Sequence, residues 1–128
     1  MDAYRVFYGA VSDLEKARVF MHERIIKKDS VIFVVQVEDR ISGFTQLYPS
    51  FSSVSLEPLF ILNDLFVFPD QRGKGLGEAL LLHAQDFCRE RKAKGLALET
   101  AADNPAKNLY ERLGWKRDAR VFHYFWTS

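Results

Sequence analysis

Apolar residues in the middle of the chain follow the pattern of β-strands. Residues 31–37 are β-branched and almost wholly apolar, which predicts a strand buried on both faces. The polar residues 38–40 predict a tight turn, after which residues 41–48 form the returning strand. A third and longer strand candidate covers residues 59–68. Together, the three segments predict the centre of a β-sheet.

Polar and small residues interrupt this pattern at two places. The stretch 49–55 holds four serines and a proline, and it predicts a loop between two strands. Asn63 and Asp64 lie inside the third strand candidate, although strands disfavour both residue types. Later in the chain, short strands are expected over residues 96–100 and 121–126.

Helical periodicity and capping signals predict helices around these strands. Residues 12–15 read Ser-Asp-Leu-Glu, a capping box that predicts a helix start at Ser12. In the strongest candidate, apolar residues recur three or four positions apart over residues 76–91. Pro105–Leu113 predicts a short helix that begins with proline and is followed by a glycine. The order of these elements predicts a mixed α/β fold in a single domain, residues 1–128.

Composition narrows the classes of protein that the chain can represent. A length of 128 residues with 48% apolar residues suits one globular domain. The net charge of +1 argues against a nucleic-acid partner. Cys88 is the only cysteine, so no internal disulfide is possible, and it is expected to be inert core. No apolar run has the length of a membrane span and the first residues hold no apolar segment of signal-peptide type, so we expect a cytoplasmic protein without a membrane partner.

A glycine-rich turn between the third strand and the main helix is the strongest chemical signal. Residues 72–77 read Arg-Gly-Lys-Gly-Leu-Gly. Glycines let several backbone N–H groups face one point, at the positive end of the following helix. Arg72 and Lys74 add positive charge at the same place. The turn therefore predicts a phosphate or pyrophosphate site, and a merely flexible turn is the alternative.

Two other phosphate motifs fit less well. A dinucleotide fingerprint needs G-x-G-x-x-G and an acidic residue about 20 positions later. Glu99 has such a position, but the glycines here run G-x-G-x-G and the chain is short for that fold. A P-loop ends in Gly-Lys-Ser/Thr, which is absent.

Three segments resemble the GNAT superfamily of N-acetyltransferases. Gln71–Gly77 resembles the pyrophosphate motif of that family, and Leu62–Val67 resembles its fourth strand. Ala106–Trp115 resembles its second signature, a helix with a tyrosine before a Leu-Gly-aromatic ending. The likeness runs from about residue 12 to the C-terminus, and the strand is most similar to the diamine and polyamine (spermidine/spermine-type) branch. The resemblance implies a mixed, mostly antiparallel central sheet flanked by helices.

The resemblance also implies an activity and a set of site residues. Acetyl-CoA would donate an acetyl group directly to a primary amine, without a covalent enzyme intermediate. Tyr110 would protonate the leaving thiolate, which is a role for a positioned acid. The residues implied in binding acetyl-CoA are Leu65, Phe66, Val67, Arg72, Gly73, Lys74, Gly75, Leu76, Gly77, Glu78, Asn104 and Asn108.

The sequence departs from the family pattern at positions that matter for chemistry. Asp103 stands where the family has an asparagine, and Asn104 follows one place later. Asn63 stands where the polyamine branch has a glutamate, and an amide cannot act as a base. Asp64 and Glu99 remain as candidate bases, acting directly or through water, or as structural residues.

The expected acceptor is a small amine or a lysine-like terminus. Residues 31–68 carry a net charge of −3, from one arginine and four acidic residues, and a negative site favours a cationic amine. Tyr48, Phe51 and Phe60 are candidates to line its pocket. The three histidines lack metal-ligand spacing, so no metal is predicted. A non-catalytic CoA-binding module is the alternative function, and a nucleotide-dependent oxidoreductase is a weaker third.

The beginning of the chain raises a question about assembly. The GNAT fold opens with a short edge strand and a helix, and Asp2–Tyr8 resembles the end of that helix. The first strand is therefore expected to be absent, and an exposed sheet edge invites pairing. We expect a homodimer, with or without exchanged elements, or a start codon placed too late.

Overall fold

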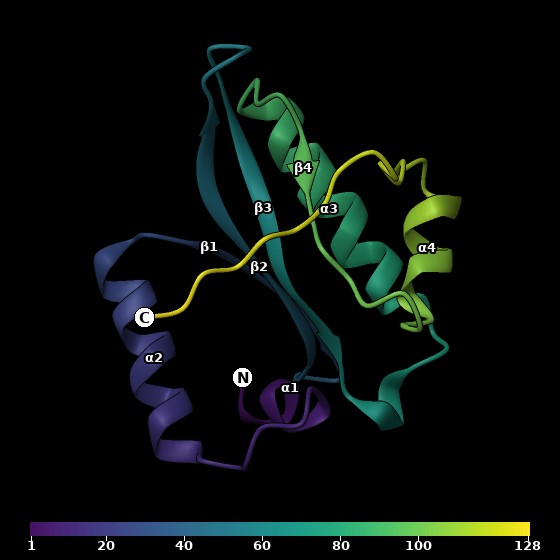
Figure 1. Cartoon of the computed structure of the whole chain (residues 1–128). Coiled ribbons are helices and arrows are strands. Elements are labelled where there is room, and N and C mark those ends of the chain that lie inside the picture. The colour runs from purple at the N-terminus through teal and green to yellow at the C-terminus, as the bar shows by residue number, and fades with distance from the viewer. The chain divides into compact units, whose positions relative to one another are not determined.

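The computed structural model describes residues 1–128, which divide into two compact units, Met1–Leu98 and Glu99–Ser128. The first unit contains a sheet, three α-helices and a 3-10 turn (Figure 1). In chain order, its elements are α1 (Asp2–Phe7), α2 (Leu14–Lys27), β1 (Val31–Val37), β2 (Arg40–Ser52), β3 (Glu57–Val67), η1 (Pro69–Gln71), α3 (Leu76–Glu90) and β4 (Leu96–Ala97). The second unit contains α4 (Ala106–Arg112).

The sheet of the first unit has the strand order β1-β2-β3-β4. The pairs β1–β2 and β2–β3 are antiparallel, and β4 runs parallel to β3 over only two residue pairs, Phe60 with Leu96 and Ile61 with Ala97. The predicted mixed, mostly antiparallel sheet with flanking helices is thus confirmed.

Helices cover both faces of this sheet. On one face, the ring of Phe87 from α3 packs against Phe33 of β1 and Phe60 of β3, with ring centroids 5.4 and 5.1 Å apart. On the other, Tyr4 of α1 packs against Phe44 and Phe66. Because side chains alternate between the two faces of a strand, Phe44 points away from its neighbour Thr45, the partner of Phe33 in the ladder.

A β-bulge distorts β3 at the position where the sequence pattern is interrupted. Gln46 pairs with Asp64, but the next residue of β2, Leu47, pairs with Leu62. Asn63 is therefore an extra residue on β3. A bulge re-aims side chains, so the regular alternation of faces is broken at Asn63 and Asp64. This explains why two residues that strands disfavour stand inside the strand.

Several predicted boundaries are wrong for local physical reasons. The cap of α2 is Asp13, whose carboxylate accepts from Lys16 N at 3.0 Å, because Ser12 uses its hydroxyl to donate to Asp2 at 2.7 Å. The predicted loop 49–55 is mostly strand: β2 continues to Ser52, and the turn covers only residues 53–56. β1 is half-exposed rather than buried on both faces, because it forms an edge of the sheet.

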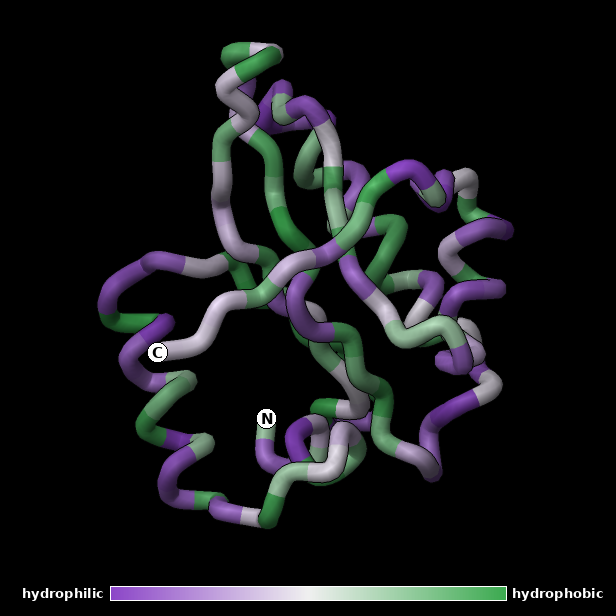
Figure 2. The backbone as a smooth tube through the Cα atoms, viewed as in Figure 1, coloured by the Kyte–Doolittle hydropathy of each residue, from purple (hydrophilic) through white to green (hydrophobic).

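The amphipathic character of the two long helices differs. Along α2, hydrophobic and hydrophilic residues alternate (Figure 2), and Ala17 is its only buried residue. In α3, the buried residues are Leu80, Leu81, Ala84 and Cys88. Burial raises the pKa of the Cys88 thiol above its ordinary value, which fits the prediction of a core residue. None of the helices combines the length and apolar character needed to cross a membrane.

The second unit differs from expectation at its end. Helix α4 has Pro105 at its N-cap, and Gly114 follows its C-cap with a φ of 91°, as predicted. Residues 121–126, however, form no strand, and the large apolar side chains there are 67–87% exposed. Apolar and aromatic residues favour a strand only where a neighbouring strand completes their backbone hydrogen bonds, so composition alone does not produce one.

Candidate functional site

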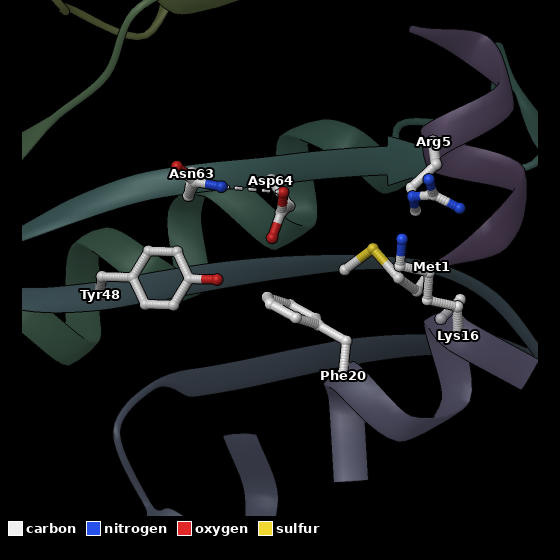
Figure 3. A pocket seen from close by; sticks show the side chains of 8 residues that line it. Met1, Arg5, Lys16, Phe20, Tyr48, Asn63 and Asp64 are labelled. Atoms are coloured by element: carbon white, nitrogen blue, oxygen red, sulfur yellow. Dashed lines mark hydrogen bonds between the residues drawn. The ribbon is translucent and has the colours of Figure 1, made fainter. Parts of the chain in front are cut away.

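A cavity of about 240 Å³ opens over the bulge of β3. The bulge brings Asn63 and Asp64 to the same cavity, although they are neighbours in the sequence. Figure 3 shows Tyr48 of β2 and Phe20 of α2 facing this space from two further sides. The complete lining is Met1, Arg5, Lys16, Ala17, Phe20, Tyr48, Asn63 and Asp64.

Asp64 is the buried acid of this cavity, with only 3% of its surface exposed. Asn63 Nδ2 donates to its Oδ1 at 3.1 Å, and Gln46 Nε2 donates to its Oδ2. Both donors are amide N–H groups, so each side-chain oxygen of Asp64 acts as an acceptor. Thr45 Oγ1 donates to the backbone oxygen of Asp64 at 2.7 Å, which holds the main chain at the same point. The site therefore holds the carboxyl group of Asp64 in one orientation.

Tyr48 contributes a hydroxyl group to the same cavity. Its ring points from β2 toward the space between Asp64 and Phe20 (Figure 3). Burial raises the pKa of Tyr48 above its ordinary value of 10.0, and the nearby charge of Asp64 raises it further. The hydroxyl is therefore protonated at neutral pH and is able to donate a hydrogen bond.

The charge around the cavity is mixed. Asp64 is the only acidic residue in the lining, whereas Arg5 and Lys16 come from the helical side. The guanidinium of Arg5 lies 4.0 Å from Asp2, and one of its nitrogens donates to Val11 O at 3.4 Å. The net charge of −3 counted along residues 31–68 therefore does not translate into a uniformly negative pocket.

Beside the bulge, one edge of β3 is open. β4 pairs with β3 only at Phe60 and Ile61, so the residues from Leu62 to Val67 have no strand on that edge. Phe68 N donates to Ser42 O on β2, and peptide groups alternate between the two edges of a strand. Leu65 and Val67 therefore direct their N–H and C=O groups to the open edge.

The glycine-rich turn directly follows this strand and η1. Gly73 and Gly75 adopt left-handed φ values of 79° and 77°, which glycine accepts without strain. Backbone hydrogen bonds are formed by Gln71 and Arg72 before the turn and by Ala79 after it. The N–H groups from Gly73 to Gly77 thus have no backbone partner, and they precede or begin α3. This is the geometry of an anion site at a helix N-terminus.

The two cations of the turn are not placed alike. Arg72 turns back to β3: its Nε donates to Val67 O at 2.9 Å, and its guanidinium lies over the rings of Phe7 and Phe66. Lys74 remains at the turn, where its ammonium donates to Gln71 Oε1 at 2.9 Å. Arg72 therefore fastens the turn to the strand, and Lys74 supplies the charge next to the free N–H groups.

The remaining predicted site residues belong to the second unit. Tyr110 is buried in α4, with its ring centroid 5.7 Å from that of Trp115. Asn104 precedes the N-cap of α4, and its Oδ1 accepts from Ala106 N, in the first residue of the helix, at 3.0 Å. Asn108 is exposed on the same helix. Glu99 is 75% exposed and its carboxylate lies 2.9 Å from His123 Nδ1.

Sequence reasoning missed part of the cavity. Of the three aromatic candidates, only Tyr48 lines it, since Phe51 is 79% exposed and Phe60 packs on α3. The amide of Gln46 and its partner Ser30 were not singled out, because nothing local distinguishes them from other strand and turn residues. The interruption at Asn63 was the available signal for the bulge. No group of three or more histidine, cysteine or acidic side chains forms a metal site.

The chain is similar to known acetyltransferases over nearly its whole length. The sequence pattern of the Acetyltransferase (GNAT) family matches residues 1–115. An uncharacterized N-acetyltransferase, YhfO, of Bacillus subtilis (strain 168) is 45% identical over 122 residues, which are 94% of this chain and 82% of that protein. A probable acetyltransferase of Haemophilus influenzae is 28% identical, with 86% and 84% covered. A crystal structure of a probable acetyltransferase superposes with a TM-score of 0.92 at 38% identity, covering 99% of this chain and 86% of that one.

Proposed function

Because the chain belongs to the acetyltransferase (GNAT) family, we propose that it transfers an acetyl group from acetyl-CoA to a primary amine of a small molecule or of a lysine-like acceptor. The observation that carries the proposal is the placement of Asp64. Its buried carboxylate faces the cavity, and Asp64 itself belongs to β3, the strand that has an open edge and is followed by the glycine-rich turn.

The residues of the turn and the open edge fit acetyl-CoA. An added Cβ at Gly73 or Gly75 would meet no atom within 4 Å, so the N–H groups there are open to a bulky ligand such as a pyrophosphate. We assign the pyrophosphate to the backbone from Gly73 to Glu78 together with Lys74. The pantetheine arm would pair with β3 at Leu65, because Arg72 already takes the carbonyl oxygen of Val67.

When bound, acetyl-CoA supplies a thioester carbonyl that an amine attacks, so that a C–N bond forms and the C–S bond breaks. Asp64 binds the incoming ammonium and takes its proton, directly or through water. We prefer Asp64 to Glu99 as the base because Glu99 is exposed and paired with His123. Tyr110 is the proposed acid for the thiolate, and Asn108 the proposed contact of the pantetheine. Asn104 is a further candidate contact, although its side-chain oxygen already accepts from Ala106 N.

The acceptor is proposed to carry a single ammonium group near Asp64. The sequence of the strand Leu62–Val67 predicts that the chain is related to the polyamine branch, and this stays a prediction. Arg5 and Lys16 on the cavity wall repel further positive charge, which favours an acceptor with one amine over an extended polycation. Acceptors with one amine and polyamines are therefore both to be tested as substrates.

The direct test is acetylation of an amine panel, with acetylated product measured by mass spectrometry. Diamines, polyamines, amino acids and a lysine peptide would be compared at fixed acetyl-CoA. Product on at least one amine supports the proposal. Binding of acetyl-CoA without product on any amine favours the alternative, a non-catalytic CoA-binding module, which the amide at Asn63 in place of an acid motivates.

The assembly and cellular context are also proposals. β1 is an edge strand, and such strands offer unpaired peptide groups to a second chain, so we propose a homodimer. Its molar mass in solution tests this, and a stable, active monomer would contradict it. We further propose that residues 1–128 work as one acetyltransferase domain in the cytoplasm, without a metal.

A further inference from the structure

We propose that Gln46, itself fixed by Ser30, is a positioning residue that aims the Asp64 carboxylate into the acceptor cavity. The inference deepens the proposed function and rests on it for the role of the cavity. It concerns three side chains from three segments of the first unit: the turn before β1, the middle of β2 and the bulge of β3.

The contacts form a continuous chain in a buried place. Ser30 Oγ donates to Gln46 Oε1 at 2.9 Å, and Gln46 Nε2 donates to Asp64 Oδ2. Gln46 is fully buried, with 0% of its surface exposed, and both ends of its amide are used in this chain. A buried amide is costly unless it is hydrogen-bonded, so its partners explain why a polar residue is tolerated here.

The direction of the Gln46 amide follows from the chemistry of its two partners. A carboxylate oxygen accepts only, so the group that faces Asp64 must be the NH₂ end. A hydroxyl is able to donate to the oxygen end, and Ser30 does so. If the amide rotated by half a turn, two acceptor oxygens would face each other. Asp64 therefore selects the orientation of the Gln46 amide, and Ser30 anchors its oxygen end in that orientation.

The same contacts leave part of the carboxylate available to an acceptor. Gln46 occupies one lone pair of Oδ2 and Asn63 one lone pair of Oδ1, out of about four on a carboxylate. The two amides hold the carboxylate from both oxygens, so its plane cannot turn away from the cavity. An ammonium group that enters finds a charge already oriented, and the cost of ordering it is avoided.

The test compares Gln46→Leu and Ser30→Ala with the matched control Ser42→Ala. The control removes a hydrogen bond of an equally buried residue of β2, from Ser42 Oγ to the backbone oxygen of Arg40 at 3.1 Å, and leaves Asp64 untouched. For the amine, we expect kcat/KM to fall about 10–100-fold in Gln46→Leu and about threefold in Ser30→Ala, with the KM for acetyl-CoA unchanged. Ser42→Ala is expected to lower the melting temperature but to keep kcat/KM within about twofold.

A second readout separates this inference from the proposed function. The side-chain amide protons of Gln46 are expected to be downfield-shifted and slow to exchange in NMR spectra, and Asp64→Ala, which leaves no acceptor, should remove both features. This holds whether or not any amine is acetylated. Should wild type acetylate no amine, the function fails while the NMR result still decides the contacts. Fast-exchanging Gln46 protons, or equal kinetic losses in Gln46→Leu and Ser42→Ala, would overturn the inference.

Discussion

Asn63 and Asp64 are adjacent in the sequence, yet their side chains meet, with Asn63 Nδ2 donating to Asp64 Oδ1 at 3.1 Å. In a regular strand, such neighbours point to opposite faces of the sheet. The bulge that pairs Gln46 with Asp64 and Leu47 with Leu62 makes the contact possible. The extra residue in β3 thus allows two consecutive side chains, Asn63 and Asp64, to line the same cavity.

Asn63 is expected to assist Asp64 through this contact. In Asn63→Ala the carboxylate loses a hydrogen bond to its charged form, so kcat/KM for the amine should fall about tenfold. Steady-state kinetics measure the effect. The control is Gln36→Ala, which removes an exposed side-chain amide from β1, away from the cavity. Equal activity of the two variants would count against the role of Asn63.

Gly75 is expected to be required for binding acetyl-CoA. Its φ of 77° is left-handed, and a residue with a Cβ pays about 1–2 kcal/mol to hold that conformation. In Gly75→Ala the turn relaxes and its N–H groups move, so the Kd for acetyl-CoA should rise about 5–30-fold. Titration calorimetry measures this.

Gly95→Ala is the control for the turn, because Gly95 has no left-handed φ and an added Cβ there meets no atom within 4 Å. Its affinity for acetyl-CoA should equal that of wild type. If both alanine variants bind alike, the assignment of the pyrophosphate to residues 73–78 is wrong.

Tyr48 should make stability sensitive to alkaline pH. Its pKa is raised above the unfolded value of 10.0, so the unfolded chain releases this proton first. The contribution of Tyr48 is therefore complete below pH 10 and is lost as pH rises through the folded-state pKa. The free energy of unfolding should fall less between pH 8 and pH 11 in Tyr48→Phe than in wild type. An equal fall in the free energy of unfolding in the two proteins would show that burial does not raise the pKa of Tyr48.

Tyr110 is predicted to act in the chemical step. Tyr110→Phe keeps the ring that packs near Trp115 and removes only the hydroxyl. We expect kcat to fall about 100-fold, while the Kd for acetyl-CoA stays within about twofold. Single-turnover kinetics and calorimetry separate the two quantities. Unchanged turnover would remove Tyr110 from the mechanism.

Much of this fold could be predicted from local patterns. The strands near residues 31–37 and 59–68 and the helix after Gly75 carry their own periodicity, and the glycine-rich turn carries its own chemistry. These features depend on residues that are close in the sequence, so local patterns are enough to predict them. The capping box predicts Ser12 as the cap of α2, but the cap is Asp13. The reason is a distant residue, Asp2, whose carboxylate accepts from the Ser12 hydroxyl and from Asp13 N.

The cavity itself could not be predicted in the same way. Asn63 and Asp64 interrupt the strand pattern in the sequence, but the bulge that they belong to depends on the register between β2 and β3. Gln46 and Ser30 are 16 residues apart, and Gln46 and Asp64 are 18 apart, so their contacts arise only from the sheet. The apolar residues 121–126 have the composition of a strand, but a strand forms only where a partner strand exists.

The measurement that tests the account most directly is acetylation of a cognate amine by wild type and by Asp64→Asn. The substitution keeps the size of the side chain and removes its charge. We predict that wild type forms the acetylated amine, and that kcat/KM for that amine falls about 100-fold or more in the variant with an unchanged KM for acetyl-CoA. Wild-type activity of Asp64→Asn on that amine would contradict the account.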